Sequence, residues 1–142
     1  MPTTKGLSMM DVLSQATHNF VQHQLRLTST EVDLSQEYDL YHSDISLLSS
    51  GQTQQASFYY TDDFMQMVCM AMLGEEAEDD ETLEDLIGET TNQIAGSAKI
   101  LATQAFDIGL PNYLGKVKEQ PENGTYRAFS IDNKVMLYIT LK

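Results

Sequence analysis

The sequence contains few of the residues that mark disulfide-bonded or membrane-spanning proteins. One cysteine among 142 residues cannot form an internal disulfide, and Cys69 lies in an apolar run where we expect a buried thiol. No apolar run reaches the length of a membrane span, and the first residues lack the apolar core of a secretion signal. We therefore expect a soluble, cytoplasmic protein that does not bind a membrane.

Basic residues are also scarce, which limits the kinds of partner. Eight Lys and Arg stand against 21 Asp and Glu, so the net charge is −13. Such a surface repels the phosphates of nucleic acids and of anionic lipids, and neither is an expected partner. A basic surface on another protein would be attracted instead.

The sequence lacks the usual metal and nucleophile motifs. His18, His23 and His42 have no ligand spacing, and we find neither a phosphate-binding glycine loop nor a local Ser-His-acid or Cys-His signature. The acidic run 75–81 lacks the spacing of a calcium loop, so we interpret it as a solvated connection. We expect no metal or cofactor in this chain.

Length and periodicity predict one domain over residues 1–142. In chain order, the patterns predict a loose lead-in over 1–7, a helix from the Ser8 cap to about Leu25, a weak extended segment at 30–35, a hairpin turning at 49–52, helices over 64–73 and 82–106, and strands near 113–118, 125–131 and 134–141. This order predicts an α+β fold with helices packed on a mostly antiparallel sheet. A weak two-fold repetition of helix followed by strands is too degenerate to prove a duplication.

Two further expectations concern single elements. The helix 64–73, between a Thr61 cap and a Gly74 stop, is apolar nearly all round, so we expect it to be largely buried. The last strand, residues 134–142, alternates strictly and contains no proline. At a sheet edge it would pair with a second copy and give a homodimer, unless the lysines at its two ends blunt that edge.

The long helix carries the most informative pattern. Its apolar residues recur at helical spacing, and the opposite side presents polar or small residues: Asp85, Glu89, Asn92, Gly96 and Lys99. Glu89 and Asn92, three residues apart, are neighbours on a helix surface. Gly96 costs this helix about 1 kcal/mol relative to alanine, and such departures concentrate at functional sites. A chance Glu-x-x-Asn on a solvated face is the competing interpretation.

The chemistry of this pair favours a site shared with another protein. The chain offers no nucleophile and no metal beside them. An amide can hold a water through its donor and its acceptor, and a carboxylate can pair with a partner's lysine. Phosphoryl transfer depends mostly on positioning and charge stabilisation, so such a helix could orient an attacking water in a phosphorylated pocket.

Two stretches resemble the CheX branch of the CheC/CheX/FliY family of chemotaxis phosphatases. They are Met70-Ala-Met-Leu-Gly-Glu-Glu76 and Leu86-Ile-Gly-Glu-Thr-Thr-Asn-Gln-Ile-Ala-Gly-Ser-Ala-Lys99. They match the family's LGEE helix end followed by GE-x-x-N-x-x-x-G-x-A-K. The later Gly109-Leu-Pro111 and the strands to Leu141 fit the family layout, which implies a CheC-like fold. The first helix lacks a Glu-x-x-Asn of its own, which favours the single-site CheX type over the two-site CheC type.

The resemblance implies a phosphatase of a phosphorylated CheY-like receiver domain. Asn92 would orient the hydrolytic water, Glu89 would contact the receiver's lysine, and the Mg²⁺ would belong to the receiver. Asp85, Gly96 and Lys99 are the expected partner-binding residues, with Gly96 leaving room for the partner backbone. The resemblance also implies a homodimer, because CheX-like proteins commonly pair.

Two alternatives remain at this point. The same fold could bind a receiver domain without catalysis, as an adaptor, or the chain could be an acidic structural domain without a receiver partner. Thr90, Thr91 and Gln93 stand where family members usually carry apolar residues. We interpret this polarity beside the motif as retuning toward a different partner.

Overall fold

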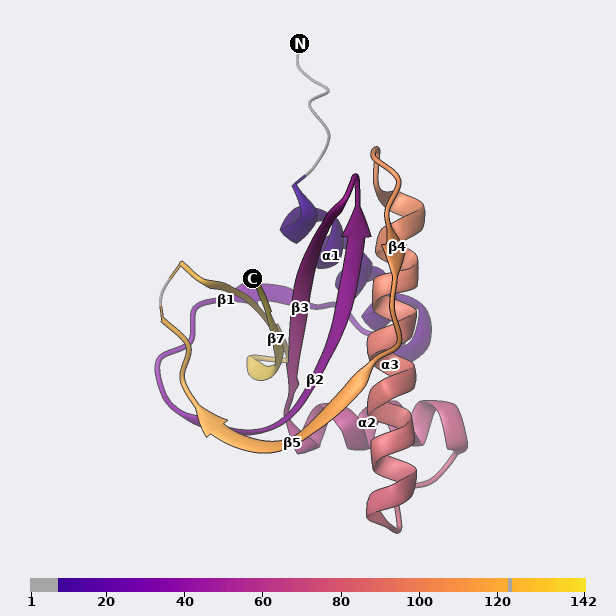
Figure 1. The fold of residues 1–142 in the computed structure, drawn as a ribbon. Helices are drawn as coiled ribbons and strands as arrows, with labels where there is room; N and C mark the ends of the chain where they lie inside the picture. Colours follow the sequence, from indigo (N-terminus) through magenta and orange to yellow (C-terminus); the bar gives the residue numbers. More distant parts are fainter. Residues whose placement is uncertain (1–7, 123) are drawn as a thin grey trace.

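The structure, a computed structural model, describes residues 8–122 and 124–142. The predicted lead-in over residues 1–7 lies outside the described residues. The described chain forms an α+β fold, as predicted, with helices on an antiparallel sheet (Figure 1).

The strands belong to one seven-stranded sheet in the order β1-β6-β7-β3-β2-β4, with β5 also paired to β2. Their bounds are β1 Thr30–Val32, β2 Tyr38–Ser49, β3 Gln52–Tyr60, β4 Asp107–Ile108, β5 Asn112–Glu119, β6 Tyr126–Ile131 and β7 Lys134–Leu141. The predicted hairpin β2–β3 pairs from Tyr41 opposite Tyr60 to Ser49 opposite Gln52. The hairpin β6–β7 turns through Asp132 and Asn133, which both have positive φ (51° and 66°), as a tight two-residue turn requires.

The sheet topology repeats along the chain. Two hairpins, β2–β3 and β6–β7, meet at the centre, where β3 pairs with β7. The strands that follow α1 and α3 pair with the other hairpin, because β1 pairs with β6, and β4 and β5 pair with β2. The two-fold repetition in the sequence therefore has a counterpart in the strand order, and α1 and α3 precede equivalent sets of strands.

The helices begin where the sequence supplies caps. Their bounds are α1 Met9–Phe20, continued by the π-helix η1 Val21–Leu25, then α2 Asp62–Leu73 and α3 Asp80–Leu101. The side chains of Ser8, Thr61 and Asp79 accept hydrogen bonds from the backbone N–H three residues ahead. Gly74 ends α2 in the left-handed conformation, with φ of 78°.

The predicted end of the long helix is wrong. We expected the helix over residues 82–106, whereas α3 starts at Asp80 and ends at Leu101. Ala102 is extended, with ψ of 142°, and Ala105 lies outside the helix and is exposed. Phe106 is buried in the core after the chain has turned back. Phe106 therefore packs in the same core as the buried residues of α3, although it lies after the end of that helix.

The expectation for α2 is also wrong in part. Only one side of α2 enters the core, through Phe64, Met65, Val68 and Cys69. Met70 and Leu73 are 49% and 53% exposed. The reason is the position of α2 at one end of the sheet, where a single side faces other elements (Figure 1).

The last strand does not lie at an edge, so the predicted mode of self-pairing is wrong. β7 pairs with β6 on one side and with β3 on the other. Leu137 and Ile139 enter the main core under the helices, whereas Tyr138 joins a second cluster on the other face and stacks on Tyr59 with ring centroids 4.4 Å apart. β7 is thus buried on both faces of the sheet, and its alternating, proline-free sequence suits a central strand.

Candidate catalytic and partner-binding site

The middle of α3 presents Glu89 and Asn92 on its exposed side. Both residues are exposed, whereas Ile87 and Ile94, on the opposite side, are completely buried. The apolar stripe therefore fixes the direction in which the two polar side chains point. Gln93 donates a hydrogen bond of 3.0 Å from Nε2 to Oε1 of Glu89 and so orients this carboxylate along the helix.

A hollow of about 430 Å³ opens beside this pair. It is lined by Glu84, Asp85, Gly88, Glu89 and Asn92 of α3 and by Leu110, Pro111 and Tyr113 of the chain that follows β4. A Cβ placed on Gly88 would lie 3.8 Å from Cγ of Pro111, so the helix and this segment are in van der Waals range there. The hollow is a shallow groove between two elements, with Glu89 and Asn92 on one wall.

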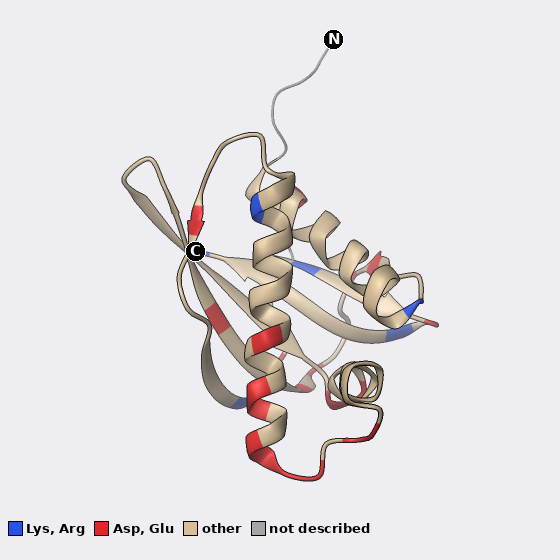
Figure 2. Cartoon of the chain, turned by 90° about the vertical axis from the view of Figure 1, so that its right-hand side faces the viewer, with Lys and Arg blue, Asp and Glu red and all other residues tan. Residues whose placement is uncertain are grey.

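The hollow is strongly acidic. Figure 2 shows acidic residues gathered in the N-terminal half of α3 and in the connection that precedes it. Burial, together with the charges of Glu84 and Asp80, raises the pKa of the Tyr113 hydroxyl, so it stays protonated at neutral pH. Among the described residues that line the hollow there is no Lys or Arg. The geometry therefore suits a partner that brings positive charge.

The two other predicted partner-binding residues of α3 lie beyond the hollow. Gly96 follows Asn92 by one turn, and a Cβ added there would meet nothing within 4 Å. Packing within the chain therefore does not explain this glycine. Lys99 is exposed, and its Nζ lies 3.1 Å from Oδ1 of Asp107, so it ties the end of α3 to β4. Asp85, in contrast, lies in the hollow with Glu89 and Asn92.

Thr90 and Thr91 do not lie on the partner surface, so the retuning that we predicted from them is wrong. Both are completely buried, and their hydroxyls donate to the carbonyl oxygens of Leu86 and Ile87. The Thr91 hydroxyl also forms a 2.8 Å hydrogen bond with that of Tyr60. These threonines are core residues that satisfy their own polar atoms and, in the case of Thr91, that of a buried tyrosine.

The second wall of the hollow was not predicted from the sequence. Leu110, Pro111 and Tyr113 were noticed only as a break and a following strand, yet they flank the motif. The one local signal is that Leu110 lies between a glycine and a proline, which mark a turn or loop. That signal does not predict which helix lies next to Leu110.

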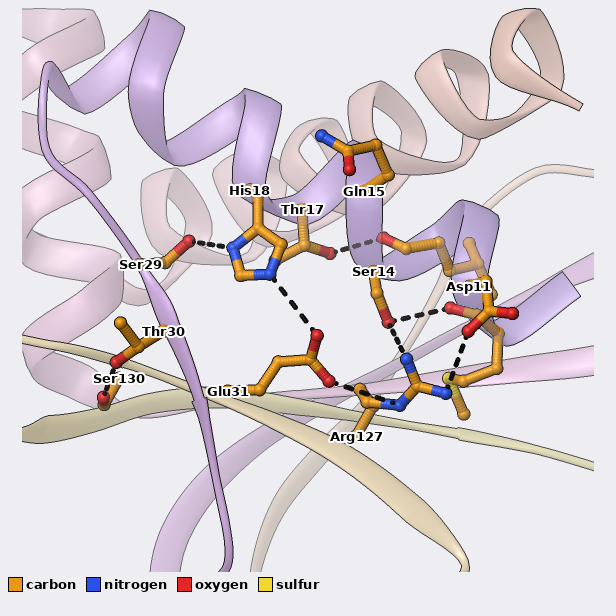
Figure 3. A network of polar contacts seen from close by, with 12 residues as sticks. Asp11, Ser14, Gln15, Thr17, His18, Ser29, Thr30, Glu31, Arg127 and Ser130 are labelled. Atoms are coloured by element: carbon orange, nitrogen blue, oxygen red, sulfur yellow. Dashed lines mark hydrogen bonds and ion pairs between the residues drawn. The ribbon is translucent and has the colours of Figure 1, made fainter. Parts of the chain in front are cut away.

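A second polar cluster, around Arg127, joins α1 to the sheet (Figure 3). Its guanidinium contacts Asp11 at 3.2 Å, Ser14 at 3.2 Å and Glu31 at 3.4 Å. Glu31 also lies 3.6 Å from Nε2 of His18, whose Nδ1 is hydrogen-bonded to Ser29. Ser29 is buried and Glu31 is held by Arg127, so this Ser-His-acid contact serves the packing of α1 on β1 and β6.

Cys69 is buried, and its burial, followed by the charges of Glu75 and Glu76, raises the pKa of the thiol. The residues that the structure describes contain no group of three or more His, Cys, Asp and Glu side chains placed to hold a metal ion. None of the helices in residues 8–122 and 124–142 is both long and apolar enough to cross a membrane.

The sequence pattern of this fold and site has a counterpart in a known family. The family model for the chemotaxis phosphatase CheX matches residues 50–132, a stretch that contains α2, the whole of α3 and the second wall of the hollow. The chain belongs to the CheX family. No curated protein matches the chain closely enough to count as a relative.

Solved structures share the fold of this CheX-family protein at low sequence identity. The crystal structure of CheX from Vibrio vulnificus has a TM-score of 0.72 and 16% identity, covering 94% of this chain and 99% of that one. CheX from Desulfovibrio desulfuricans gives 0.71 and 15%, covering 96% and 99%. The CheX-CheY-BeF3-Mg²⁺ complex from Borrelia burgdorferi gives 0.61 and 16%, covering 94% and 96%. At these identities the likeness establishes the fold.

Proposed function

We propose that this protein hydrolyses the aspartyl phosphate of a CheY-type receiver domain. The observation that carries the proposal is the exposed pair Glu89 and Asn92, side by side on a rigid helix and bordering an acidic hollow. Membership of a family of chemotaxis phosphatases supports it. The Borrelia structure, in which CheX is in complex with CheY, supports the class of partner.

Each residue of the pair has a distinct role in this proposal. The Asn92 amide holds a water by donating and accepting hydrogen bonds and orients it in line with the phosphorus–oxygen bond to the aspartate. Attack by this water breaks that bond and leaves inorganic phosphate and a free aspartate. Glu89 already accepts a hydrogen bond from Gln93 at Oε1, and its other oxygen pairs with the receiver's lysine.

The chain supplies no metal in this reaction. Mg²⁺ belongs to the receiver domain, where it neutralises the charge of the phosphoryl group. Asp85, Gly96 and Lys99 contribute to the surface that meets the receiver. Gly96 has this role because the space beside it is empty and admits a partner's backbone. The reaction takes place in the cytoplasm.

The test is a dephosphorylation assay against each phosphorylated receiver domain of the host. The wild-type protein should accelerate loss of phosphate from at least one of them. Asn92→Ala should reduce this acceleration at least about 100-fold, because water positioning is lost, and should leave binding within about threefold. Asn92 is exposed, so the variant should fold normally, which circular dichroism checks.

The same assay separates the alternative function, a receiver-binding adaptor without catalysis. An adaptor would bind a receiver domain but would leave its rate of phosphate loss unchanged. Asn92→Ala acting as fast as the wild-type protein would overturn the assignment of Asn92 while leaving the phosphatase activity in place.

A further inference from the structure

One large apolar side chain stands out beside the motif. Leu110 is 84% exposed and lines the same hollow as Glu89 and Asn92. Single exposed leucines are common on protein surfaces, so exposure alone means little. Leu110 differs from such residues in lying beside Glu89 and Asn92 and in being presented by a constrained segment of backbone.

The segment that bears Leu110 is anchored on both sides. The N–H of Gly109 donates to the carbonyl of Ser46 at 2.9 Å, immediately before Leu110. Immediately after it, Pro111 restricts the backbone, and β5 begins at Asn112, which pairs with Asp44 of β2. Leu110 is thus presented by a constrained segment, so a partner that covers it would not need to order the chain first.

The surroundings of Leu110 define the kind of surface that fits it. Pro111 and Tyr113 extend the apolar wall, while Glu84, Asp85 and Glu89 form a carboxylate rim on the opposite helix. An apolar anchor with a charged rim has the usual composition of a protein interface. The complementary surface has an apolar patch flanked by Lys or Arg.

We propose that Leu110, supported by Pro111 and Tyr113, is the anchor that docks the receiver domain on this protein. This inference rests on the proposed function and names the part of the site that sets affinity for the receiver. The occupant is a receiver domain with an apolar patch and basic side chains next to its phosphorylated aspartate. Leu110 is a binding and specificity residue and takes no part in the chemical step.

A matched pair of variants tests the anchor. Leu110→Ser removes the apolar side chain from the hollow, and Leu73→Ser removes a leucine that is 53% exposed at the end of α2, outside the hollow. Binding is measured by titration with a receiver domain that carries beryllium fluoride and Mg²⁺ in place of the phosphoryl group. Turnover is measured against the concentration of the phosphorylated receiver.

Leu110→Ser should raise both Kd and KM about tenfold and leave kcat within about twofold, because only burial of the leucine is lost. Leu73→Ser should match the wild-type protein in all three. If the wild-type protein acts on a receiver and Leu110→Ser has the same Kd, the anchor is refuted and the proposed function survives. A lowered kcat at unchanged Kd also refutes the anchor. If the wild-type protein neither binds nor dephosphorylates any receiver, both proposals fall together.

Discussion

At the scale of residues, neighbours in the sequence have opposite environments. Glu89 and Asn92 are exposed, whereas Thr90 and Thr91 between them are completely buried. The helical period of 3.6 residues causes this separation. Substitutions at Thr90 or Thr91 should therefore act through the core, and substitutions at Glu89 or Asn92 through the partner.

Glu89→Gln is the sharpest test of the charge pair in the complex. The side chain keeps its size and can still accept the hydrogen bond from Gln93, so only the charge is removed. Binding to the receiver domain should weaken about tenfold at low ionic strength and less at high salt, because salt screens such pairs. Titrations at two salt concentrations measure the difference.

The control for this test is Glu122→Gln, an exposed residue that does not line the hollow. It makes the same change in net charge, so it reports the effect of overall charge alone. Equal affinities of Glu89→Gln and wild type at low ionic strength would contradict the proposed pairing.

At the scale of elements, two ion-pair contacts tie helices to strands in different ways. Arg127 is 32% exposed and links Asp11 of α1, Glu31 of β1 and its own strand β6 (Figure 3). Lys99 of α3 is 47% exposed, and among the described residues its one ion-pair partner is the 79% exposed Asp107 of β4. The first is a partly buried network, in which charges interact more strongly than in a single solvated pair.

The two contacts should differ in their contribution to stability. Arg127→Met keeps the apolar stem but leaves two carboxylates without their cation, and it should lower the free energy of unfolding by about 1–2 kcal/mol. Lys99→Met, the matched control, should lower it by less than about 0.5 kcal/mol. Urea unfolding followed by circular dichroism measures both. If both variants lose the same free energy of unfolding, the Arg127 network contributes no more to stability than the exposed Lys99–Asp107 pair.

At the scale of the whole molecule, the pairing of strands between the two halves of the chain determines which strands lie at the edges of the sheet. The centre of the sheet is β7 and β3, and the outer strands include the short β1 and the longer β5. β5 pairs with β2, and its residues alternate between exposed and half-buried. Lys116 and Lys118 on this strand are the kind of residue that discourages pairing at an edge.

A homodimer stays a prediction, with β5 as the longer edge available in place of β7. Sedimentation equilibrium at micromolar concentration should give twice the mass of one chain. Leu114→Glu should then shift the equilibrium toward the monomer, because Leu114 is 51% exposed on β5 and the chain is already strongly acidic. Proline at Met136 or Tyr138 would not test this interface, because both residues lie on β7 at the centre of the sheet. The mass of a single chain would contradict the dimer.

Local patterns in the sequence were enough to determine several features of this protein. The caps at Ser8 and Thr61, the turn at Asp132-Asn133 and the exposed face of α3 with Glu89 and Asn92 follow from residues within one or two turns of each other. Such features depend on backbone sterics and on helical periodicity, which neighbouring residues specify. The polar half of the candidate site was predictable for this reason.

Only the tertiary structure decided the rest. Placing β7 at the centre of the sheet, leaving one side of α2 exposed and bringing Leu110 beside Asn92 all depend on which strands and helices become neighbours. The same holds for Arg127, which donates a hydrogen bond to the carboxylate of Asp11 on α1, 116 positions away in the chain. An apolar or charged residue can contact many different residues. The packing of the whole core decides which of these contacts forms.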